Sequence, residues 1–246
     1  MQPPVPLPTS ESCLFLDVDG TLIELSAHPA QTAASRALKD LLMVVNDLLG
    51  GAVALISGRP IADLDAIFFP LRLRAAGVHG GERRLQVDSE APQPAPDARL
   101  DPLRHVMMAF AAAHPGVLFE DKRIACAVHY RGRPESYSAL RRTLAPLLQT
   151  LDGEFHALDG NRVIEIKPRR FTKAHAIEEF LETPPFKDRQ PVFLGDDVTD
   201  LDGFRIIEAR RGLTVAVGDR VDAQWRLPDP AATRAWLGEF AAMCTQ

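Results

Sequence analysis

Residues 14–22 read Leu-Phe-Leu-Asp-Val-Asp-Gly-Thr-Leu, and this stretch decides the fold that we expect. An apolar run ends in two carboxylates, Asp17 and Asp19, which are followed at once by glycine. A short apolar run before a turn is typical of a buried strand in a parallel sheet. Open α/β sheets place their ligand crevice at the carboxyl ends of such strands. Because a charge beside a buried strand is costly without a partner, the two acids indicate a binding site; the alternative is an acidic turn.

The sequence around this stretch alternates strand and helix. Apolar residues at helical spacing predict a helix over residues 32–49, and Gly50-Gly51 ends it. The alternation breaks off near residue 88 and resumes at Thr172. Such alternation predicts a doubly wound parallel sheet, an α/β fold of the Rossmann-like kind. The other elements expected in this part are helices at 61–68, 172–181 and 200–210, and strands at 52–56, 71–78, 192–194 and 213–217.

Residues 88–168 have a different pattern. They begin with a proline-rich linker, 88–102, and continue in the order αββαββ. Helices are expected at 103–113 and 135–151, and strands at 117–120, 124–130, 154–158 and 163–166. Tight turns between the strands favour an antiparallel sheet with helices on one face. We therefore expect residues 1–10 to be a disordered tail, 11–87 and 169–246 to form the α/β core, and 88–168 to be an inserted α+β domain.

The composition limits the classes of function. Acidic residues outnumber Lys plus Arg by 33 to 28, and this balance disfavours nucleic acid as a partner. No apolar run reaches the length of a membrane span, and the N-terminal residues lack the features of a signal peptide. The three cysteines, Cys13, Cys126 and Cys244, lie far apart and favour reduced thiols. We expect a cytoplasmic protein.

Four loops are expected to meet at the carboxyl edge of the parallel sheet. They carry Asp17 with Asp19, Ser57, Lys173, and the acidic run that begins at Asp196. Asp17 can attack an electrophilic phosphorus and form an aspartyl phosphate, and Asp19 can move a proton as the general acid and base. Ser57 and Lys173 can hold the phosphoryl oxygens. Mg²⁺ is the expected cofactor because it prefers carboxylate oxygens.

These residues resemble the four motifs of the haloacid dehalogenase superfamily in their order along the chain. The motifs are Asp17-Val18-Asp19-Gly20-Thr21, Ser57, Lys173 and Gly195-Asp196-Asp197. The resemblance implies a Mg²⁺-dependent phosphatase whose inserted cap domain chooses the substrate. It implies catalytic roles for Asp17, Asp19 and Lys173, and phosphate binding by Ser57, Gly58 and Lys173. The implied metal ligands are Asp17, Asp19 and Asp196, supported by Asp197 and Asp200.

A narrower resemblance to trehalose-6-phosphate phosphatases covers nearly the whole chain. It rests on Ser57-Gly58-Arg59-Pro60, Gly77-Val78-His79-Gly80 with Glu82-Arg83, Glu120-Asp121-Lys122, His129-Tyr130-Arg131, Glu165-Ile166-Lys167-Pro168 and Gly195-Asp196-Asp197-Val198-Thr199-Asp200. The resemblance implies hydrolysis of trehalose 6-phosphate in trehalose biosynthesis, and a functional pairing with a trehalose-6-phosphate synthase. The implied substrate-binding residues are Arg59, His79, Glu120, Lys122, His129, Arg131, Glu165 and Lys167.

The chain departs from that family at a few positions, and alternatives stay open. Arg170 and Ala174 stand where the family usually has glycine, and Val18 where it often has tyrosine. Strand alternation predicts that His129 shares a face with Arg131, and Glu165 with Lys167. These polar residues could bind the sugar or form an ordinary solvated sheet face. Asp200 could support the metal site or cap the helix that it begins. The other functions considered are a phosphatase for sucrose 6-phosphate or mannosyl-3-phosphoglycerate, and a phospho-Asp or sugar-sensing domain without turnover.

Overall fold

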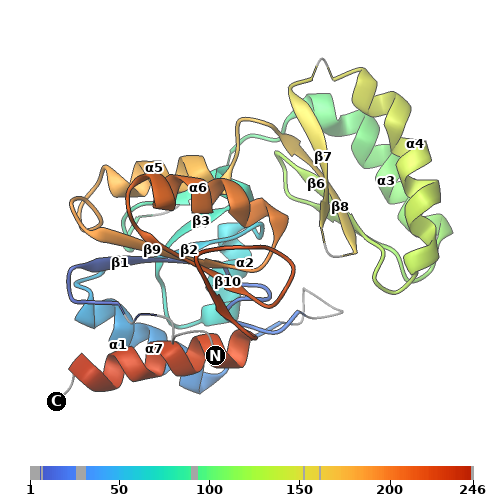
Figure 1. The fold of residues 1–246 in the computed structure, drawn as a ribbon. Helices are drawn as coiled ribbons and strands as arrows, with labels where there is room; N and C mark the ends of the chain where they lie inside the picture. The colour runs from blue at the N-terminus through green and yellow to red at the C-terminus, as the bar shows by residue number, and fades with distance from the viewer. Residues whose placement is uncertain are drawn as a thin grey trace. The chain divides into compact units, whose positions relative to one another are not determined.

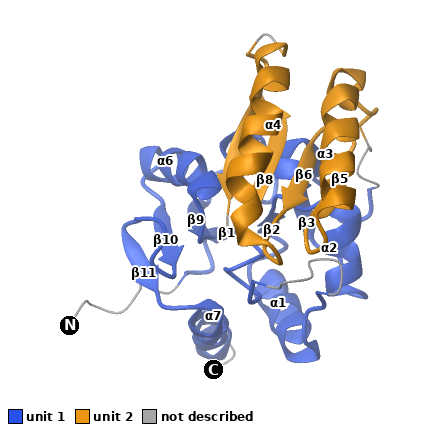
Figure 2. Cartoon of the chain, turned by 90° about the vertical axis from the view of Figure 1, so that its right-hand side faces the viewer, with its two compact units in different colours: residues 1–92, 172–246 blue, residues 93–171 orange. Residues whose placement is uncertain are grey.

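The computed structural model divides the chain into two compact units (Figure 2). The parallel-sheet unit consists of Met1–Pro92 and Thr172–Gln246, and the inserted unit of Gln93–Phe171. The structure describes residues 6, 8–25, 32–89, 94–151, 153–160 and 162–244. Most of the tail expected at residues 1–10 lies outside these ranges, as do residues 90–93 of the expected linker.

The parallel-sheet unit has a seven-stranded sheet in the order β11-β10-β9-β1-β2-β3-β4. All neighbours are parallel except β3 and β4. The order reverses direction at β1, which pairs with β2 on one side and β9 on the other, so the expected doubly wound fold is confirmed. The strands are β1 (Ser12–Leu16), β2 (Val53–Ile56), β3 (Arg74–Gly77), β4 (Glu82–Arg84), β9 (Gln190–Gly195), β10 (Leu213–Val217) and β11 (Trp225–Leu227).

Helices cover both faces of this sheet (Figure 1). Helices α1 (Arg36–Leu48) and α7 (Pro230–Cys244) lie side by side on one face, and α5 (Lys173–Leu181) and α6 (Leu201–Ala209) on the other. Helix α2 (Ile61–Phe68) joins β2 to β3. Every residue of β1 is buried, so the strand that carries the two acids runs through the centre of the hydrophobic core. Burial on both faces explains why its sequence is a continuous apolar run.

Local signals position the helix ends. Ser35 Oγ accepts a hydrogen bond from the Leu38 backbone at 3.2 Å, so α1 begins at Arg36 rather than at the expected residue 32. Thr172 Oγ1 accepts one from the His175 backbone at 3.1 Å and starts α5 at Lys173. These caps are short polar side chains just before an apolar repeat. Lys173 thereby becomes the first residue of a helix.

The sequence analysis did not identify β4, β11 and α7. Strand β4 is the charged triplet Glu82–Arg84, in which Glu82 and Arg84 are buried and Arg83 is half-buried, and each has a partner. The Arg84 guanidinium donates to both oxygens of Asp65 at 2.7 Å. Helix α7 begins with Pro230, a residue that is common at the first position of a helix. No helix within the described ranges is long and apolar enough to cross a membrane; the cytoplasmic location stays a prediction.

The inserted unit is an antiparallel sheet in the order β5-β6-β8-β7 covered by two helices. Leu103, Met107, Leu140 and Leu144 of the helices pack with apolar residues of the strands in a hydrophobic core of its own. The α+β insertion that we expected is therefore present. Its elements are η3 (Ala98–Leu100), α3 (Asp101–Ala113), β5 (Leu118–Asp121), β6 (Cys126–His129), η4 (Pro134–Ser136), α4 (Tyr137–Gln149), β7 (Phe155–Gly160) and β8 (Val163–Pro168).

The three thiols are expected to differ sharply in reactivity. Cys13 in β1 and Cys126 in β6 are buried, and burial raises the pKa of each thiol to about 12. Cys244 at the end of α7 is exposed. Because the thiolate is the reactive form, a maleimide at pH 7 should label the folded protein once, at Cys244. Mass spectrometry counts the labels, and unfolding in guanidinium should raise the count to three. A native protein labelled at Cys13 or Cys126 would contradict the burial described here.

Candidate active site

The ends of three neighbouring strands bring the expected site residues together. Strand β1 pairs with β9 and β2, with Leu16 opposite Leu194 and Leu55. The loops that follow these strands carry Asp17, Ser57 and Asp196. Parallel strands in register end at the same edge, so side chains from distant parts of the sequence meet there.

Asp17, Lys173 and Asp200 form a buried charged group. Lys173 Nζ donates to Asp17 Oδ1 and to Asp200 Oδ1, each at 2.7 Å. The three residues are at most 4% exposed. Burial and the nearby carboxylates of Asp200 and Asp196 raise the pKa of Asp17 well above its usual range, against the opposing effect of Lys173. Burial alone would lower the pKa of Lys173, but Asp17 and Asp200 raise it, so the amine stays charged.

Asp196 joins Asp17 and Asp200 in a compact acidic cluster. Each residue offers a carboxylate oxygen, and these oxygens lie within 4.8 Å of one another. Burial first, and then the charge of Asp200, raise the pKa of Asp196 to about 7. Hard carboxylate oxygens that repel one another in a buried place are the donor set that suits Mg²⁺. These residues therefore fit a magnesium ion.

Glycines make this close approach of carboxylates possible. Gly20 has a φ of +88°, and a Cβ added to it would lie 2.3 Å from Asp196 Oδ2. A Cβ at Gly195 would lie 2.4 Å from Cγ of Asp200. A side chain at either position would push a carboxylate out of the cluster. Gly20 and Gly195 are therefore needed because a larger residue at either position would collide with a carboxylate.

Asp200 supports the site rather than the helix after it. Its Oδ2 accepts hydrogen bonds from the backbones of Asp196 and Asp197 at 3.1 and 3.0 Å. It makes no side-chain hydrogen bond to α6, so the capping role that we considered for that helix is wrong. The capping box instead belongs to the short helix η5 (Val198–Asp200), which Asp197 begins. Asp200 therefore fixes the loop that presents Asp196.

The Asp19 side chain is bound to Arg59 rather than to the acidic cluster. Arg59 Nε and Nη2 donate to its two carboxylate oxygens at 2.5 and 2.6 Å. Asp19 was expected among the metal ligands, and this assignment stays a prediction; the cluster of carboxylate side chains found within the described residues consists of Asp17, Asp196 and Asp200. A guanidinium fork on a carboxylate fixes both its position and its orientation. The structure thus separates the two acids of the opening stretch.

The loop after β2 is held by the loop after β3. The backbone N–H of His79 donates to the Ser57 carbonyl at 3.0 Å, and that of Val78 to the Arg59 carbonyl at 2.9 Å. Val78 and His79 have φ values of 48° and 53°, a left-handed conformation that side chains rarely adopt. A Cβ at Gly58 would lie 2.7 Å from His79 Nε2, so only glycine fits beneath the imidazole. His79 therefore packs on the expected phosphate-binding loop.

Polar side chains gather on one face of the inserted sheet. Pairing places Glu120 and Glu165 opposite Ala127, on the face away from the helices α3 and α4. Lys122 Nζ lies 2.9 Å from Glu165 Oε2, and His129 Nε2 lies 2.7 Å from Glu120 Oε2. Burial raises the pKa of Glu120, but Lys122 and His129 outweigh it and hold that pKa below its usual value.

Two further residues of this face were expected from strand alternation. Lys167 lies in β8, two residues after Glu165 and on the same face, and its Nζ donates to the Phe171 carbonyl. Arg131 lies in a turn, because β6 ends at His129 rather than at the expected residue 130. Alternation therefore does not extend to Arg131, and its position relative to His129 follows from the turn.

Comparison with known proteins identifies the family. The sequence model of the family described as trehalose-phosphatase matches residues 15–229. This chain belongs to the trehalose-phosphatase family. It is 38% identical over 224 residues to the trehalose-6-phosphate phosphatase of Escherichia coli (strain K12), a match that covers 91% of this chain and 84% of that protein. The enzyme class that we expected, a phosphoric monoester hydrolase, is confirmed by this membership.

Solved structures confirm the fold of this trehalose-phosphatase. The C-terminal domain of Candida albicans trehalose-6-phosphate phosphatase superposes with a TM-score of 0.81 at 20% identity, over 94% of this chain and 92% of that one. A haloacid dehalogenase-like hydrolase from Bacteroides thetaiotaomicron gives 0.64 at 16% identity, over 93% and 98%. At these identities the likeness establishes the fold alone, and that fold is the haloacid dehalogenase fold that we expected.

The two departures from the trehalose-phosphatase pattern do not strain the third loop. Of the described non-glycine residues, several have a left-handed φ, and neither Arg170 nor Ala174 is among them. The Arg170 guanidinium lies over the Phe171 ring, 4.7 Å from its centroid. Ala174 is the second residue of α5. The backbone freedom of glycine is therefore not needed at either position.

Sequence analysis missed Arg220. Arg220 follows β10, and it donates to Asp196 Oδ2 at 3.0 Å and to Asp197 Oδ1 at 2.8 Å. The available signal was its place, since the loop after a further parallel strand opens on the same edge as Asp17 and Asp196. Its chemistry is considered below.

Proposed function

We propose that this trehalose-phosphatase hydrolyses trehalose 6-phosphate to trehalose and phosphate through an aspartyl phosphate on Asp17. The observation that carries the proposal is the buried group in which Lys173 binds Asp17 and Asp200, at the same sheet edge as Ser57 and Asp196. Family membership supplies the substrate class. Such an enzyme would consume the product of a trehalose-6-phosphate synthase, with which we propose a functional pairing.

The proposed reaction has two displacements. An Asp17 oxygen bonds to phosphorus as the bond from phosphorus to the sugar oxygen breaks, and Asp19 gives that oxygen a proton. Asp19 then takes a proton from the water that attacks the aspartyl phosphate and releases phosphate. Arg59 binds both oxygens of Asp19, so this ion pair has to open before Asp19 can transfer a proton. In the proposed reaction it opens when the substrate binds, and the guanidinium then becomes available to the substrate. The Ser57 hydroxyl and the Gly58 backbone hold the phosphoryl group, with Lys173 as counter-charge.

Mg²⁺ is the cofactor of this proposal. Asp17, Asp19 and Asp196 would hold it, with Asp200 and Asp197 in support, and the Asp19 side chain would also transfer the proton. When bound, the ion supplies positive charge that keeps the buried carboxylates ionised and offsets the charge of the phosphate. The raised pKa values of Asp17 and Asp196 support this assignment, since both acids lack enough positive charge without a cation.

The decisive experiment compares phosphate release from several sugar phosphates with and without Mg²⁺. We expect trehalose 6-phosphate to be hydrolysed with the highest kcat/KM, and chelation by EDTA to stop turnover. Sucrose 6-phosphate and mannosyl-3-phosphoglycerate are the competing substrates. Faster phosphate release from either of them would support the phosphatase activity but overturn trehalose 6-phosphate as the preferred substrate. Release from none of them would favour a binding domain without turnover.

The polar face of the inserted sheet is proposed to select the sugar. This face consists of Glu120, Lys122, His129 and Glu165, which ion pairs and hydrogen bonds join, together with Lys167. His79 and Arg131 are further candidates for sugar contacts. Charged donors and acceptors suit a disaccharide, which offers many hydroxyl groups. An ordinary solvated face would show no preference among phosphate esters.

Replacing Glu165 tests this selection. Glu165→Ala should lower kcat/KM for trehalose 6-phosphate by roughly tenfold to a hundredfold, because it removes a charged hydrogen-bond partner and leaves Lys122 with only the more distant carboxylate of Glu120. Hydrolysis of a small aryl phosphate should change far less. Glu135→Ala, an exposed position beside α4, serves as the matched variant and should leave both substrates unaffected. An equal loss for the two substrates would show that Glu165 has no part in choosing the sugar.

A further inference from the structure

Arg220 neutralises part of the acidic cluster from within the protein. Its guanidinium bridges two carboxylates, with Nη1 on Asp196 Oδ2 at 3.0 Å and Nη2 on Asp197 Oδ1 at 2.8 Å. The side chain of Asp196 is 7% exposed, that of Asp197 19%, and that of Arg220 32%. The bridge therefore lies at the edge of the buried site, where water screens it only in part.

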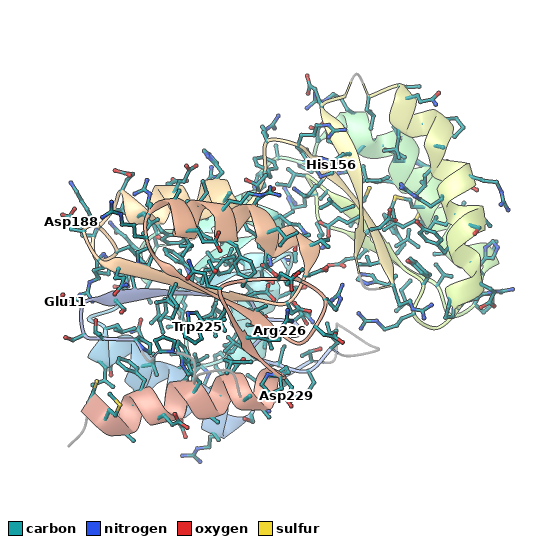
Figure 3. The ribbon with its side chains drawn as sticks, in the orientation of Figure 1. Glu11, His156, Asp188, Trp225, Arg226 and Asp229 are labelled. Atoms are coloured by element: carbon teal, nitrogen blue, oxygen red, sulfur yellow. The ribbon has the colours of Figure 1, made fainter. Side chains whose placement is uncertain are left out.

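The loop that carries Arg220 is held in place from both sides. Gly218 donates its backbone N–H to the Leu227 carbonyl at 2.9 Å, and the Val221 side chain is buried in the core. Arg226 of β11, whose side chain is labelled in Figure 3, donates to the Gly218 carbonyl, and to the Val221 carbonyl at 3.0 Å. Arg220 thus projects from a loop whose backbone is fixed on both sides of it.

The Asp196 oxygen that Arg220 binds lies beside the loop that carries Asp17. Asp196 Oδ2 lies 2.3 Å from the point where a Cβ on Gly20 would stand, so this oxygen is turned toward the loop of Asp17. A cation held jointly by Asp17 and Asp196 would lie on that side. A guanidinium on the same oxygen repels such a cation and competes for the electron pairs of the carboxylate.

We infer that Arg220 sets the magnesium affinity of the site by acting as a built-in competing cation, which weakens Mg²⁺ binding and stabilises the metal-free protein. The inference rests on the magnesium site of the proposed function and adds a residue to it. Four carboxylates of the site face the charges of Lys173 and Arg220, which leaves a formal charge of −2, and removing Arg220 would make it −3. A more negative site binds a divalent cation more tightly.

The test measures Mg²⁺ binding directly, by calorimetry on the full chain at low ionic strength and pH 8. Arg220→Gln should bind Mg²⁺ about tenfold more tightly than the parent. Its Tm without metal should be lower, and saturating Mg²⁺ should raise that Tm by more than it raises the Tm of the parent. Arg220→Lys keeps the charge and should stay within about threefold of the parent affinity. Arg205→Gln makes the same change of charge at an exposed position of α6 and should not alter the affinity.

Each outcome separates the inference from the proposal beneath it. Weaker or unchanged binding by Arg220→Gln, in a parent that binds Mg²⁺, would overturn the inference alone and make Arg220 an orienting residue for Asp196. Tight binding by Arg220→Lys equal to that of Arg220→Gln would also overturn it, because charge would then not be the cause. A parent that binds no Mg²⁺ would overturn the magnesium site and the inference together.

Discussion

Asp17→Asn is expected to abolish phosphate release, with a loss in kcat on the order of 10⁴-fold or more. Loss of the nucleophile removes the covalent route altogether, which leaves only binding and electrostatic effects. The substitution keeps the shape of the side chain, and its amide oxygen can still accept the hydrogen bond from Lys173 Nζ. The fold should therefore survive. Steady-state phosphate release from trehalose 6-phosphate measures the loss, and circular dichroism verifies the fold.

Two other variants show whether the loss is specific. Asp40→Asn changes an exposed acid of α1 and should leave turnover at the parent level. Asp19→Asn should slow the reaction but allow an aryl phosphate, which needs no proton on its leaving group, to load Asp17 and accumulate a phosphoenzyme that is detectable by mass spectrometry. Turnover retained by Asp17→Asn, or a phosphoenzyme in that variant, would refute Asp17 as the nucleophile.

The core of the site could be predicted because strand order and motif position determine it together. Asp17, Ser57 and Asp196 each follow an apolar run, and parallel pairing of β1, β2 and β9 is sufficient to bring them to one edge. Lys173 lies 156 positions after Asp17, yet its place at the start of a helix was visible in the sequence as Thr172 before an apolar repeat. These residues could be predicted to meet because their positions depend on the backbone topology and not on side-chain contacts.

The predictions failed where the partner of a charge decides the structure. Nothing in the triplet Glu82–Arg84 suggests a strand, but Glu82 Oε2 accepts the Ile61 N–H at 2.7 Å and Arg84 binds Asp65. Asp19 and Arg59 were assigned separate roles, and the structure joins them. Side-chain pairing between loops has no periodicity to reveal it.

The inserted unit shows the same limit. Alternation along β8 placed Glu165 and Lys167 on one face, and the structure agrees. Alternation could not place Arg131, because β6 ends at His129, one residue earlier than expected. The orientation of the Arg131 side chain therefore follows from the turn and not from the sheet. Strand ends are set by hydrogen bonds to other segments, such as that from the Tyr130 N–H to the Arg162 carbonyl at 2.9 Å. Those partners are distant in sequence.

Asp196→Asn is expected to stabilise the metal-free protein while it removes the response to Mg²⁺. The folded state raises the pKa of Asp196 to about 7, so the stability that its protonated form contributes is present at pH 4 and is lost as the pH rises through 7. Asparagine has no such charge. The raised pKa of Asp196 already includes the lowering effect of Arg220 and corresponds to at most about 4 kcal/mol, so we expect a gain on the order of 2 kcal/mol at pH 8.

The measurement is Tm against pH, with and without Mg²⁺. Without metal, the variant should melt roughly 4–8 °C above the parent at pH 8, and the difference should shrink toward pH 4. Mg²⁺ should raise the Tm of the parent at pH 8 and do so less at pH 5.5, because a proton on Asp196 then competes with the ion. Asp202→Asn, an exposed acid of α6, should behave as the parent does. A less stable Asp196→Asn, or one that responds to Mg²⁺ as the parent does, would mean that Asp196 is a structural acid rather than a metal ligand.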